Sequence, residues 1–354
     1  MKSSVSTGIR ETRRYKEKRE AILDAGARLF NQRGVKGTTL GDIAQSVGLV
    51  TNSVTYYYRK KEDLAAACLL SSMEIIDGLV AAAQAEATPS DRVRRLLSSY
   101  LALLAAIERG DHPEIALFND IRALTGAQMQ SCFDAYTNMF RSFRRLIRPQ
   151  SDGNRDRASE NSRTHLLLSV FVTVKQLARR YHVEEYPRTA ERLADVLVGG
   201  VFADGVDWPA AGPLPLRTAT AGDSEISTES FLRAATVLIN EQGYRGASVD
   251  KISAYLNVTK GSFYHHNDNK DDVVAACFAR SFEIVRHAQN DATERLASGA
   301  ERLAAISSTL ATSQMAGHGP LLRTSAWSAL PDEVRYDVLR SMNRQTQRFA
   351  SIIN

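Results

Sequence analysis

The chain has 354 residues, which is long enough to bury two domains of ordinary size. Its hydrophobic content of 44% is typical of a globular protein, and its formal net charge of +5 permits an anionic partner without requiring one. No apolar run approaches the ~18 residues that a membrane span needs, and the polar start is not that of a signal peptide. Three cysteines form an odd, sparse set that indicates a reducing compartment. We therefore predict a cytoplasmic protein that does not enter a membrane.

Basic residues crowd the first twenty positions of the chain. They are Lys2, Arg10, Arg13, Arg14, Lys16, Lys18 and Arg19. Such a basic arm can contact phosphate groups of a nucleic acid. The alternative is a solvated tail without a partner.

The segment after this arm has a twin far along the chain. Residues 22–76 and 231–285 align without a gap at a constant offset of 209 positions. Each copy opens with an amphipathic helix, and we expect the following glycine, Gly34 or Gly243, to end it in the left-handed conformation. The apolar faces of these two helices are Ile22, Ala25, Leu29 and Phe30, and Phe231, Ala234, Leu238 and Ile239.

The caps of the second helix also repeat. Thr39 and Ser248 can each cap its start. Gly48 ends it in the first copy, and Asn257 stands at the matching position of the second copy. Asn is the other residue that tolerates the left-handed conformation at low cost. Both copies therefore predict the same backbone, a three-helix head with a helix-turn-helix.

Between the two heads the sequence predicts further helices. Their approximate spans are 62–86, 90–109, 113–124, 125–148, 163–182 and 187–204. Residues 149–161 are polar and predict a loop, and the Pro- and Gly-containing segment that begins at residue 207 predicts a linker. The second copy has no counterpart to the helices at 163–182 and 187–204. Either it has lost them or this sequence is a shortened version of a longer chain, and an end within an apolar helix favours the latter.

The predicted fold class is all-α: two helix-turn-helix heads, each followed by a helical-bundle region, the second one shortened. The family resemblance described below implies that these bundle regions serve ligand binding and dimerisation. The predicted domains are a basic arm at 1–17, a first helix-turn-helix DNA-binding domain at 18–66, a first helical ligand-binding and dimerisation domain at 67–206, a linker at 207–224, a second helix-turn-helix DNA-binding domain at 225–275 and a second, incomplete helical regulatory domain at 276–354.

The third helix of each head carries short or hydrogen-bonding side chains on its outer face, as the reading of base edges requires. Aromatic and basic residues that follow it can reach backbone phosphates. We predict that the DNA-binding residues are Thr39, Thr51, Asn52, Ser53, Thr55, Tyr56, Tyr57 and Lys61 in the first head, and Ser248, Thr259, Lys260, Gly261, Ser262, Tyr264, His265, His266 and Lys270 in the second. Tyr58 is assigned to the core.

These heads resemble the TetR/AcrR family of bacterial transcriptional regulators. The resemblance rests on patterns such as Thr39-Leu40 with Ile43-Ala44 and Gly48, Lys61-Glu62-Asp63-Leu64, and their twins in the second head. It implies a repressor that binds double-stranded operator DNA as a dimer and leaves when a small-molecule effector enters the helical domain. It also implies a homodimer formed through residues 163–182 and 187–204. The alternative is that the two units of one chain pair with each other.

The first head departs from the family pattern at its third helix. Asn52 and Thr55 stand where the family usually has Gly and Tyr. Val50 occupies the position of a Ser or Thr cap, so we expect the cap to shift to Thr51.

The second head departs from the pattern behind its third helix. Asn267 replaces an aromatic core residue and is followed by Asp268, Asp271 and Asp272. We expect this acidic cluster to repel phosphates, and the lost aromatic residue to weaken the packing of the third helix against the head. We therefore predict that the first head is the principal DNA reader and that the second binds more weakly or reads a different site.

Apolar and aromatic side chains recur at helical spacing in the first helical domain. Most such stripes are core, and the alternative is the wall of a ligand pocket between helices. The candidate pocket residues are Tyr100, Leu104, Phe118, Met129, Phe133, Tyr136 and Phe140.

The sequence contains no nucleophile–base pair, Gly-rich phosphate loop or paired acid motif, so we predict no enzyme, no catalytic residue and no cofactor. The histidines at 265 and 266 lack the ligand spacing of a zinc site, so we predict no metal. The predicted function is a DNA-binding transcriptional regulator, a repressor released by an effector. The alternative is a helical ligand-binding or protein-interaction module whose second head no longer binds DNA.

Overall fold

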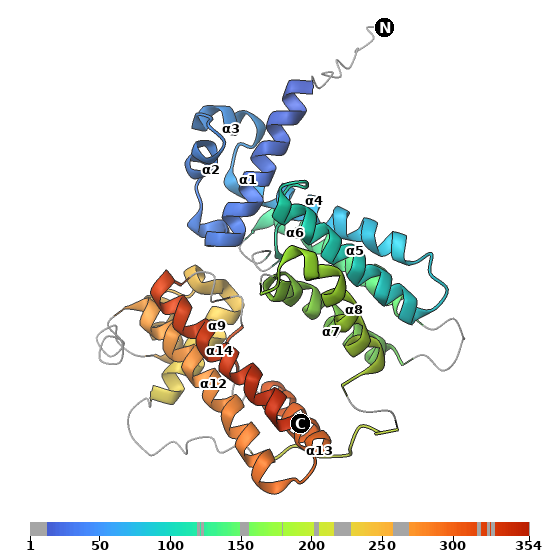
Figure 1. Ribbon diagram of the computed structural model, residues 1–354. Coiled ribbons are helices and arrows are strands. Elements are labelled where there is room, and N and C mark those ends of the chain that lie inside the picture. Colours follow the sequence, from blue (N-terminus) through green and yellow to red (C-terminus); the bar gives the residue numbers. More distant parts are fainter. Residues whose placement is uncertain are drawn as a thin grey trace, which may run out of the picture. The chain divides into compact units, whose positions relative to one another are not determined.

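Helices and the loops that join them make up the part of the chain that the structure, a computed structural model, describes (Figure 1). This part comprises residues 13–118, 121, 124–148, 156–178, 180–201, 205–215, 228–257, 269–316, 320–323, 326 and 330–353. No strand occurs within these ranges. The predicted all-α fold is therefore confirmed.

The chain divides into two compact units, residues 1–201 and 202–354. The helices of the first unit are α1 (Arg13–Gly37), α2 (Leu40–Ser46), α3 (Thr51–Tyr57), α4 (Lys61–Ala83), α5 (Pro89–Arg109), α6 (Gly126–Leu146), α7 (Arg157–Ala178), the 3-10 helix η2 (Val183–Glu185) and α8 (Tyr186–Gly199). Those of the second are α9 (Thr228–Gly246), α10 (Val249–Leu256), α12 (Lys270–Arg295), α13 (Gly299–Met315) and α14 (Asp332–Ile353).

The first head consists of α1, α2 and α3 (Figure 1), and its buried apolar side chains belong to a core that continues into the helical domain of the unit. Ile22 of α1, Ile43 of α2 and Val54 of α3 are completely buried in it. Each such side chain stabilises the head by about 1.5–3 kcal/mol through its removal from water. Because α1 begins at Arg13, residues 13–17 of the predicted arm belong to this helix.

The central helix of the first unit is α4, which packs against α1, α5 and α6. Leu64, Leu69 and Met73 are among its buried residues. By length and composition α4 could cross a membrane, but half of its most apolar window is buried within the unit. That burial is the pattern expected of the central helix of a bundle.

The predicted caps occur in both heads. Thr39 and Ser248 accept hydrogen bonds at the starts of α2 and α10. Gly48 has φ of 66°. Asn257 ends α10 in the left-handed conformation, with φ of 56° and ψ of 42°, as its alignment with that glycine predicts.

The two glycines that follow the first helices interrupt them, as predicted. Gly34 has φ and ψ of 69° and 163°, and Gly243 has 73° and 168°, which are not helical angles. The positive φ was expected, but ψ is extended and not that of the left-handed helical conformation, and a further helical turn follows each glycine, up to Gly37 and Gly246. Each glycine therefore makes a kink, and the shared dihedral angles show that both units bend in the same way.

The helix expected at 113–124 is wrong for the residues that the structure describes there. Residues 113–117 instead form an extended segment, which we call the strap. Asn31 of α1 donates to the Ile115 carbonyl and accepts from the Leu117 amide, both at 2.8 Å. Ser72 of α4 accepts from the Ala116 amide at 2.8 Å. These bonds satisfy backbone groups that a helix would have satisfied internally.

The second unit repeats the strap at residues 320–323. Asn240 donates to the Leu321 carbonyl and accepts from the Arg323 amide, both at 2.9 Å. Ser281 accepts from the Leu322 amide at 2.9 Å. The junction between head and bundle is therefore built alike in both units.

Part of the predicted linker packs against the second unit. The amide of Leu214 donates to the Thr309 hydroxyl of α13 at 2.8 Å. Its side chain is partly buried against an apolar cluster that includes Ala292, Ile306 and Ile352. This end of the predicted linker is therefore tied to the bundle that follows it.

Candidate nucleic-acid interface

The outer face of α3 in the first head is open to solvent. Thr51 and Asn52 are exposed, and Tyr56 is 74% exposed. Ser53 and Thr55 are half-buried. Because Val54 anchors the opposite face in the core, these polar side chains remain on the surface of the head.

The start of α3 has no side-chain cap. Val50 is the residue before the helix, its side chain is 70% exposed, and it makes no capping hydrogen bond. Thr51 is already the first helical residue, so the expected shift of the cap to Thr51 is wrong. One turn further on, the Thr55 hydroxyl donates to the Asn52 carbonyl at 3.0 Å.

α2 is held by a reciprocal pair at its start. The Thr39 amide and hydroxyl both donate to the Asp42 carboxylate, at 2.8 and 2.7 Å, and the Asp42 amide donates to the Thr39 hydroxyl at 3.1 Å. These bonds hold the pKa of Asp42 below its ordinary value. Thr39 is exposed, but its hydroxyl is occupied by this capping role.

Three tyrosine rings meet beside the outer face of α3. Tyr15 of α1 lies 4.7 Å from Tyr57 and 6.3 Å from Tyr56, measured between ring centroids. Tyr56 and Tyr57 meet edge to face at 5.3 Å. Desolvation, with the neighbouring rings, raises the pKa of Tyr57, so its hydroxyl stays protonated at neutral pH and can donate a hydrogen bond. Tyr58 is buried, as predicted for a core residue.

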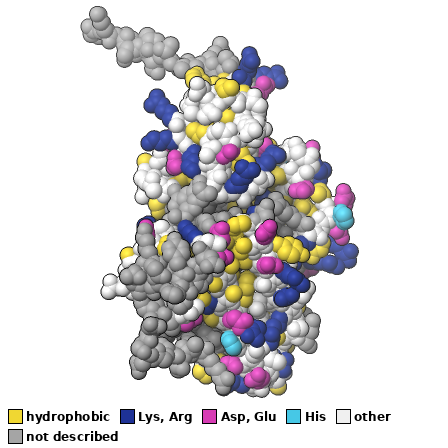
Figure 2. Space-filling model, turned by 90° about the vertical axis from the view of Figure 1, so that its left-hand side faces the viewer, with side chains coloured by type: hydrophobic (Ala, Val, Ile, Leu, Met, Phe, Trp, Pro, Cys, Tyr) yellow, Lys and Arg dark blue, Asp and Glu magenta, His cyan; other side chains and the backbone are white. Residues whose placement is uncertain are grey.

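Tyr15 is a residue of this surface that the sequence reasoning missed. It lies in a segment assigned only by its charge, between Arg14 and Lys16. An aromatic residue within a basic stretch is the signal that could have found it, because such residues combine stacking with phosphate attraction. Figure 2 shows Lys and Arg side chains, in dark blue, around the head in the upper part of the picture.

Lys61 stands at the corner between the head and α4. Its ammonium group donates to the Thr38 carbonyl at 3.1 Å, and its side chain is half-buried. The residue therefore braces the corner of the helix-turn-helix as well as adding positive charge there.

The second head is described only in part. Ser248 caps α10 by accepting from the Lys251 amide at 3.3 Å, and Lys270 is the first residue of α12. The other predicted DNA-binding residues of this head lie outside the described residues: Thr259, Lys260, Gly261, Ser262, Tyr264, His265 and His266.

The candidate pocket residues of the first unit lie at different depths. Tyr100 and Leu104 are buried, and the Tyr100 hydroxyl donates to the Phe171 carbonyl at 3.3 Å. Met129 and Phe133 are 39% and 56% exposed. The remaining three, Phe118, Tyr136 and Phe140, are half-buried. The pocket stays a prediction.

Cysteine chemistry is confined to the interior. Cys68 and Cys277 each donate, at 3.5 Å, to the carbonyl of the matching first-helix residue, Leu23 or Leu232. Burial raises the pKa of Cys68 to about 12 and that of Cys277 to about 11. Both thiols are therefore protonated core groups and poor nucleophiles.

Comparison with known proteins identifies both heads. The sequence model of the family described as "Bacterial regulatory proteins, tetR family" matches residues 22–68 and 231–277. The transposon Tn10 TetC protein of Escherichia coli is 39% identical over 57 residues, which are 16% of this chain and 29% of that protein. The HTH-type transcriptional repressor KstR2 of Mycolicibacterium smegmatis is 27% identical over 103 residues, 29% of this chain and 49% of that protein. The chain thus spans less than half the length of these curated relatives.

Solved structures resemble the chain over about half its length. A TetR-family transcriptional regulator from Bordetella parapertussis is 19% identical, covers 52% of this chain and 96% of its own, and has a TM-score of 0.44.

Proposed function

Because this chain belongs to the TetR family of bacterial regulatory proteins and contains two tandem units, we propose that it is a DNA-binding transcriptional regulator that represses by occupying an operator. The observation that carries the proposal is the exposed outer face of α3, with Asn52 and Tyr56 open to solvent and Val54 anchoring the helix from behind. Such a helix can enter a major groove and present its polar side chains to base edges. The protein would act in the cytoplasm, where its DNA lies.

Within the proposed interface, the two kinds of contact have different roles. The residues at the start of α3 would read bases, and the tyrosine cluster with Lys61 would contact phosphates. The Thr39 hydroxyl already donates to Asp42. Thr39 would therefore contact DNA through its exposed surface without donating a hydrogen bond from its hydroxyl.

The test is the salt dependence of binding to nonspecific duplex DNA. A protein that neutralises six to ten phosphates loses affinity by about 10³–10⁵-fold between 50 and 200 mM salt. A steep slope supports the proposal. Binding that hardly changes with salt contradicts it and favours a ligand-binding or protein-interaction module instead.

We propose that two copies of the chain pair through α7 and α8. Leu166 of α7 is 66% exposed, and Val196 and Leu197 of α8 are 48% and 36% exposed. Apolar side chains on two neighbouring helices are a surface that a second copy can bury. Heads related by the resulting two-fold axis should engage half-sites about 35 Å apart, one turn of DNA. A light-scattering mass of one chain in a tight DNA complex would contradict this and favour pairing within the chain.

We propose that a small-molecule effector in the helical domain of the first unit releases the DNA. The strap supports this idea, because it joins three parts of the unit. The Glu114 amide donates to Asp24 of α1 at 2.6 Å, while the Glu114 carboxylate pairs with Lys175 of α7, and both side chains of that pair are largely buried. A shift of α7 is thereby passed to the first helix of the head.

Thermodynamic linkage gives the test of effector release. An effector that weakens operator binding by a given factor must bind the DNA-free protein better by the same factor. Ligands that stabilise the first unit are titrated against operator affinity. A bound ligand that leaves operator affinity unchanged contradicts release.

A further inference from the structure

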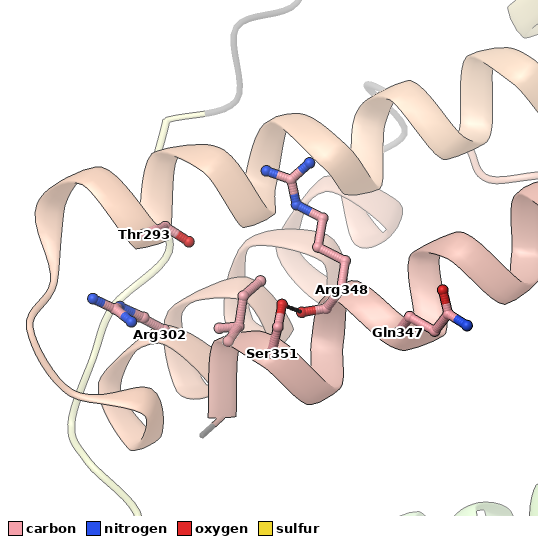
Figure 3. Close-up of a pocket in the computed structure, with 6 residues that line it drawn as sticks. Thr293, Arg302, Gln347, Arg348 and Ser351 are labelled. Atoms are coloured by element: carbon pink, nitrogen blue, oxygen red, sulfur yellow. Dashed lines mark hydrogen bonds between the residues drawn. The ribbon is translucent and has the colours of Figure 1, made fainter.

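The second unit contains a surface cavity where three helices meet. It has a volume of about 430 Å³ and lies between the end of α12, the start of α13 and the end of α14. Its lining residues are Thr293, Arg302, Gln347, Arg348, Ser351 and Ile352. Figure 3 shows the Arg348 side chain extending from α14 toward α12, with Thr293 and Arg302 beside the end of α12.

The cavity has two positive charges in its lining and no negative one. Arg302 donates through Nε to the Leu296 carbonyl at 2.9 Å, and Arg348 donates through one Nη to the Asn290 side chain. Neither guanidinium forms an ion pair with a carboxylate of the described residues. A guanidinium has five N–H donors, so each can still bind an oxyanion in its planar fork.

The cavity also has an apolar side. Ile352 is 5% exposed and belongs to the apolar cluster that Leu296, Leu310 and Phe349 cover. The Ser351 hydroxyl, which also lines the cavity, donates to the Arg348 carbonyl at 2.9 Å (Figure 3). A molecule in the cavity would therefore meet hydrocarbon on one side and guanidinium donors on the other.

A buried amide close to this cavity lacks a partner. Gln289 lies one turn before Thr293 on α12, and the Thr293 hydroxyl donates to its backbone carbonyl at 2.8 Å. The Gln289 side chain is completely buried, and neither its amide oxygen nor its amide nitrogen has a hydrogen-bond partner in the structure. An unpaired amide in an apolar interior costs free energy, but Gln289 is not among the residues that line the cavity, so this cost concerns the packing of α12 behind it.

The first unit has different side chains at the corresponding place. At the position that matches Thr293 it has Gln84, whose side chain donates to the Ser142 carbonyl of α6 at 3.5 Å. Ser142 is in turn the match of Arg348, because the two are separated by the same number of positions as Ile115 and Leu321, which take matching places in the two straps. Arg302 has its match in Arg92, which makes the same kind of bond, to the Glu86 carbonyl at 2.9 Å. The second unit has thus replaced a bridging glutamine by a short threonine and a small serine by an arginine.

We propose that this cavity binds a small molecule through an oxyanion group, a carboxylate or a phosphate, held by Arg348 and Arg302. Charge-assisted bonds to a planar guanidinium are among the strong polar contacts of proteins, and a cavity of this size holds a small organic anion. Ile352 would contact the apolar part of the ligand. The site is independent of which head binds DNA, because it is built from the second bundle alone.

The test uses the full-length, DNA-free protein and calorimetric titration with three probes: hexanoate, the uncharged hexanamide and inorganic phosphate. Hexanoate should bind at least about tenfold more tightly than hexanamide, since only the former offers an oxyanion to the guanidinium groups. Tighter binding of hexanoate than of phosphate assigns the site to carboxylates, and the reverse assigns it to phosphates. Equal affinity for hexanoate and hexanamide, or no binding of any probe at millimolar concentration, overturns the proposal.

Two variants locate the binding. Arg348→Ser installs the first unit's residue and should weaken hexanoate binding by about tenfold or more. Arg340→Ser removes an exposed charge from the same helix outside the cavity and should leave binding unchanged. Equal losses in both variants would show that only the general charge matters and would overturn the site.

A third variant tests the binding group with a smaller change to the side chain, and circular dichroism shows whether each variant is folded. Arg348→Lys keeps the charge but loses the planar fork, so it should retain an intermediate preference for hexanoate over hexanamide. An intermediate preference in a folded Lys variant, weaker than that of the native chain, supports the guanidinium fork as the binding group. A Lys variant that binds hexanoate as tightly as the native chain contradicts it. DNA affinity is measured separately, so failure here leaves the proposed regulator function untouched.

Discussion

In the first unit Asn31 holds the strap with two hydrogen bonds, and in the second unit Asn240 does the same at matching positions. The buried cysteines and the kinked glycines agree equally well between the units. The surfaces around this shared framework differ. Asp42 completes a reciprocal cap on α2, whereas Lys251 stands at the matching position of α10, and the far end of the second bundle has an arginine-lined cavity. Both units therefore share the bonds that join head to bundle, while the side chains at the proposed binding surfaces differ.

The largest expected effect comes from breaking the shared junction. Asn31→Ala removes two hydrogen bonds and leaves a strap carbonyl and amide unpaired, which should lower the stability of the first unit by about 2–3 kcal/mol. Hydrogen exchange should then accelerate in α1 and α4 peptides and stay unchanged in α9 and α12 peptides. Asn240→Ala should give the mirrored pattern. Faster exchange in both units with either variant, or no change in either unit, would contradict the interpretation that each asparagine stabilises only its own unit.

The next largest effect distinguishes the contributions of the two heads to operator affinity. Lys61→Ala removes a positive charge and the bond to Thr38, and we expect it to lower operator affinity by about tenfold, or about 1.4 kcal/mol. Lys270→Ala, the matched change in the second head, should cost less at the same salt concentration. Melting curves of both variants show whether the heads remain folded. A greater loss for Lys270→Ala reverses the ranking of the heads.

A smaller effect concerns the matched turn residues. Gly48→Ala places a side chain at φ of 66° and should cost about 1 kcal/mol of stability, because only Gly and, to a lesser degree, Asn adopt this conformation readily. Asn257→Gly in the second head should be neutral within a few tenths of a kcal/mol. Urea unfolding measures both changes. A destabilising Asn257→Gly would mean that the Asn side chain has a further role.

The smallest effect is a pH dependence confined to the first head. The pKa of Asp42 is lowered by its bonds to Thr39, so its stabilisation of α2 is complete above the ordinary pKa of an aspartate and is lost as the pH falls through the lowered value. In α10 the matching position is Lys251, so the reciprocal carboxylate bond of α2 has no counterpart at that position, and we expect a smaller loss there. Amide exchange of α2 should rise in acid more than that of α10, and Asp42→Asn should abolish the difference. The same acid sensitivity in both helices would contradict this cause.

The repeat explains what could be predicted from sequence. Caps and left-handed residues such as Asn257 are local, so one aligned copy informs the other, and the structure has them where the alignment places them. The strap could not be predicted, because its partners Asp24, Asn31 and Ser72 lie far away in sequence while its own apolar residues imitate a helix. The uncapped start of α3 and the stacking of Tyr15 likewise depend on contacts that spacing alone does not reveal.

Selection of bound sequences from random duplex DNA tests the central claim most directly, because it counts the heads in use. With the full chain, the account predicts that the most enriched motif is an inverted repeat with half-sites about one helical turn apart, and that Lys61→Ala weakens its enrichment more than Lys270→Ala does. A most enriched motif that survives Lys61→Ala and disappears with Lys270→Ala would contradict it.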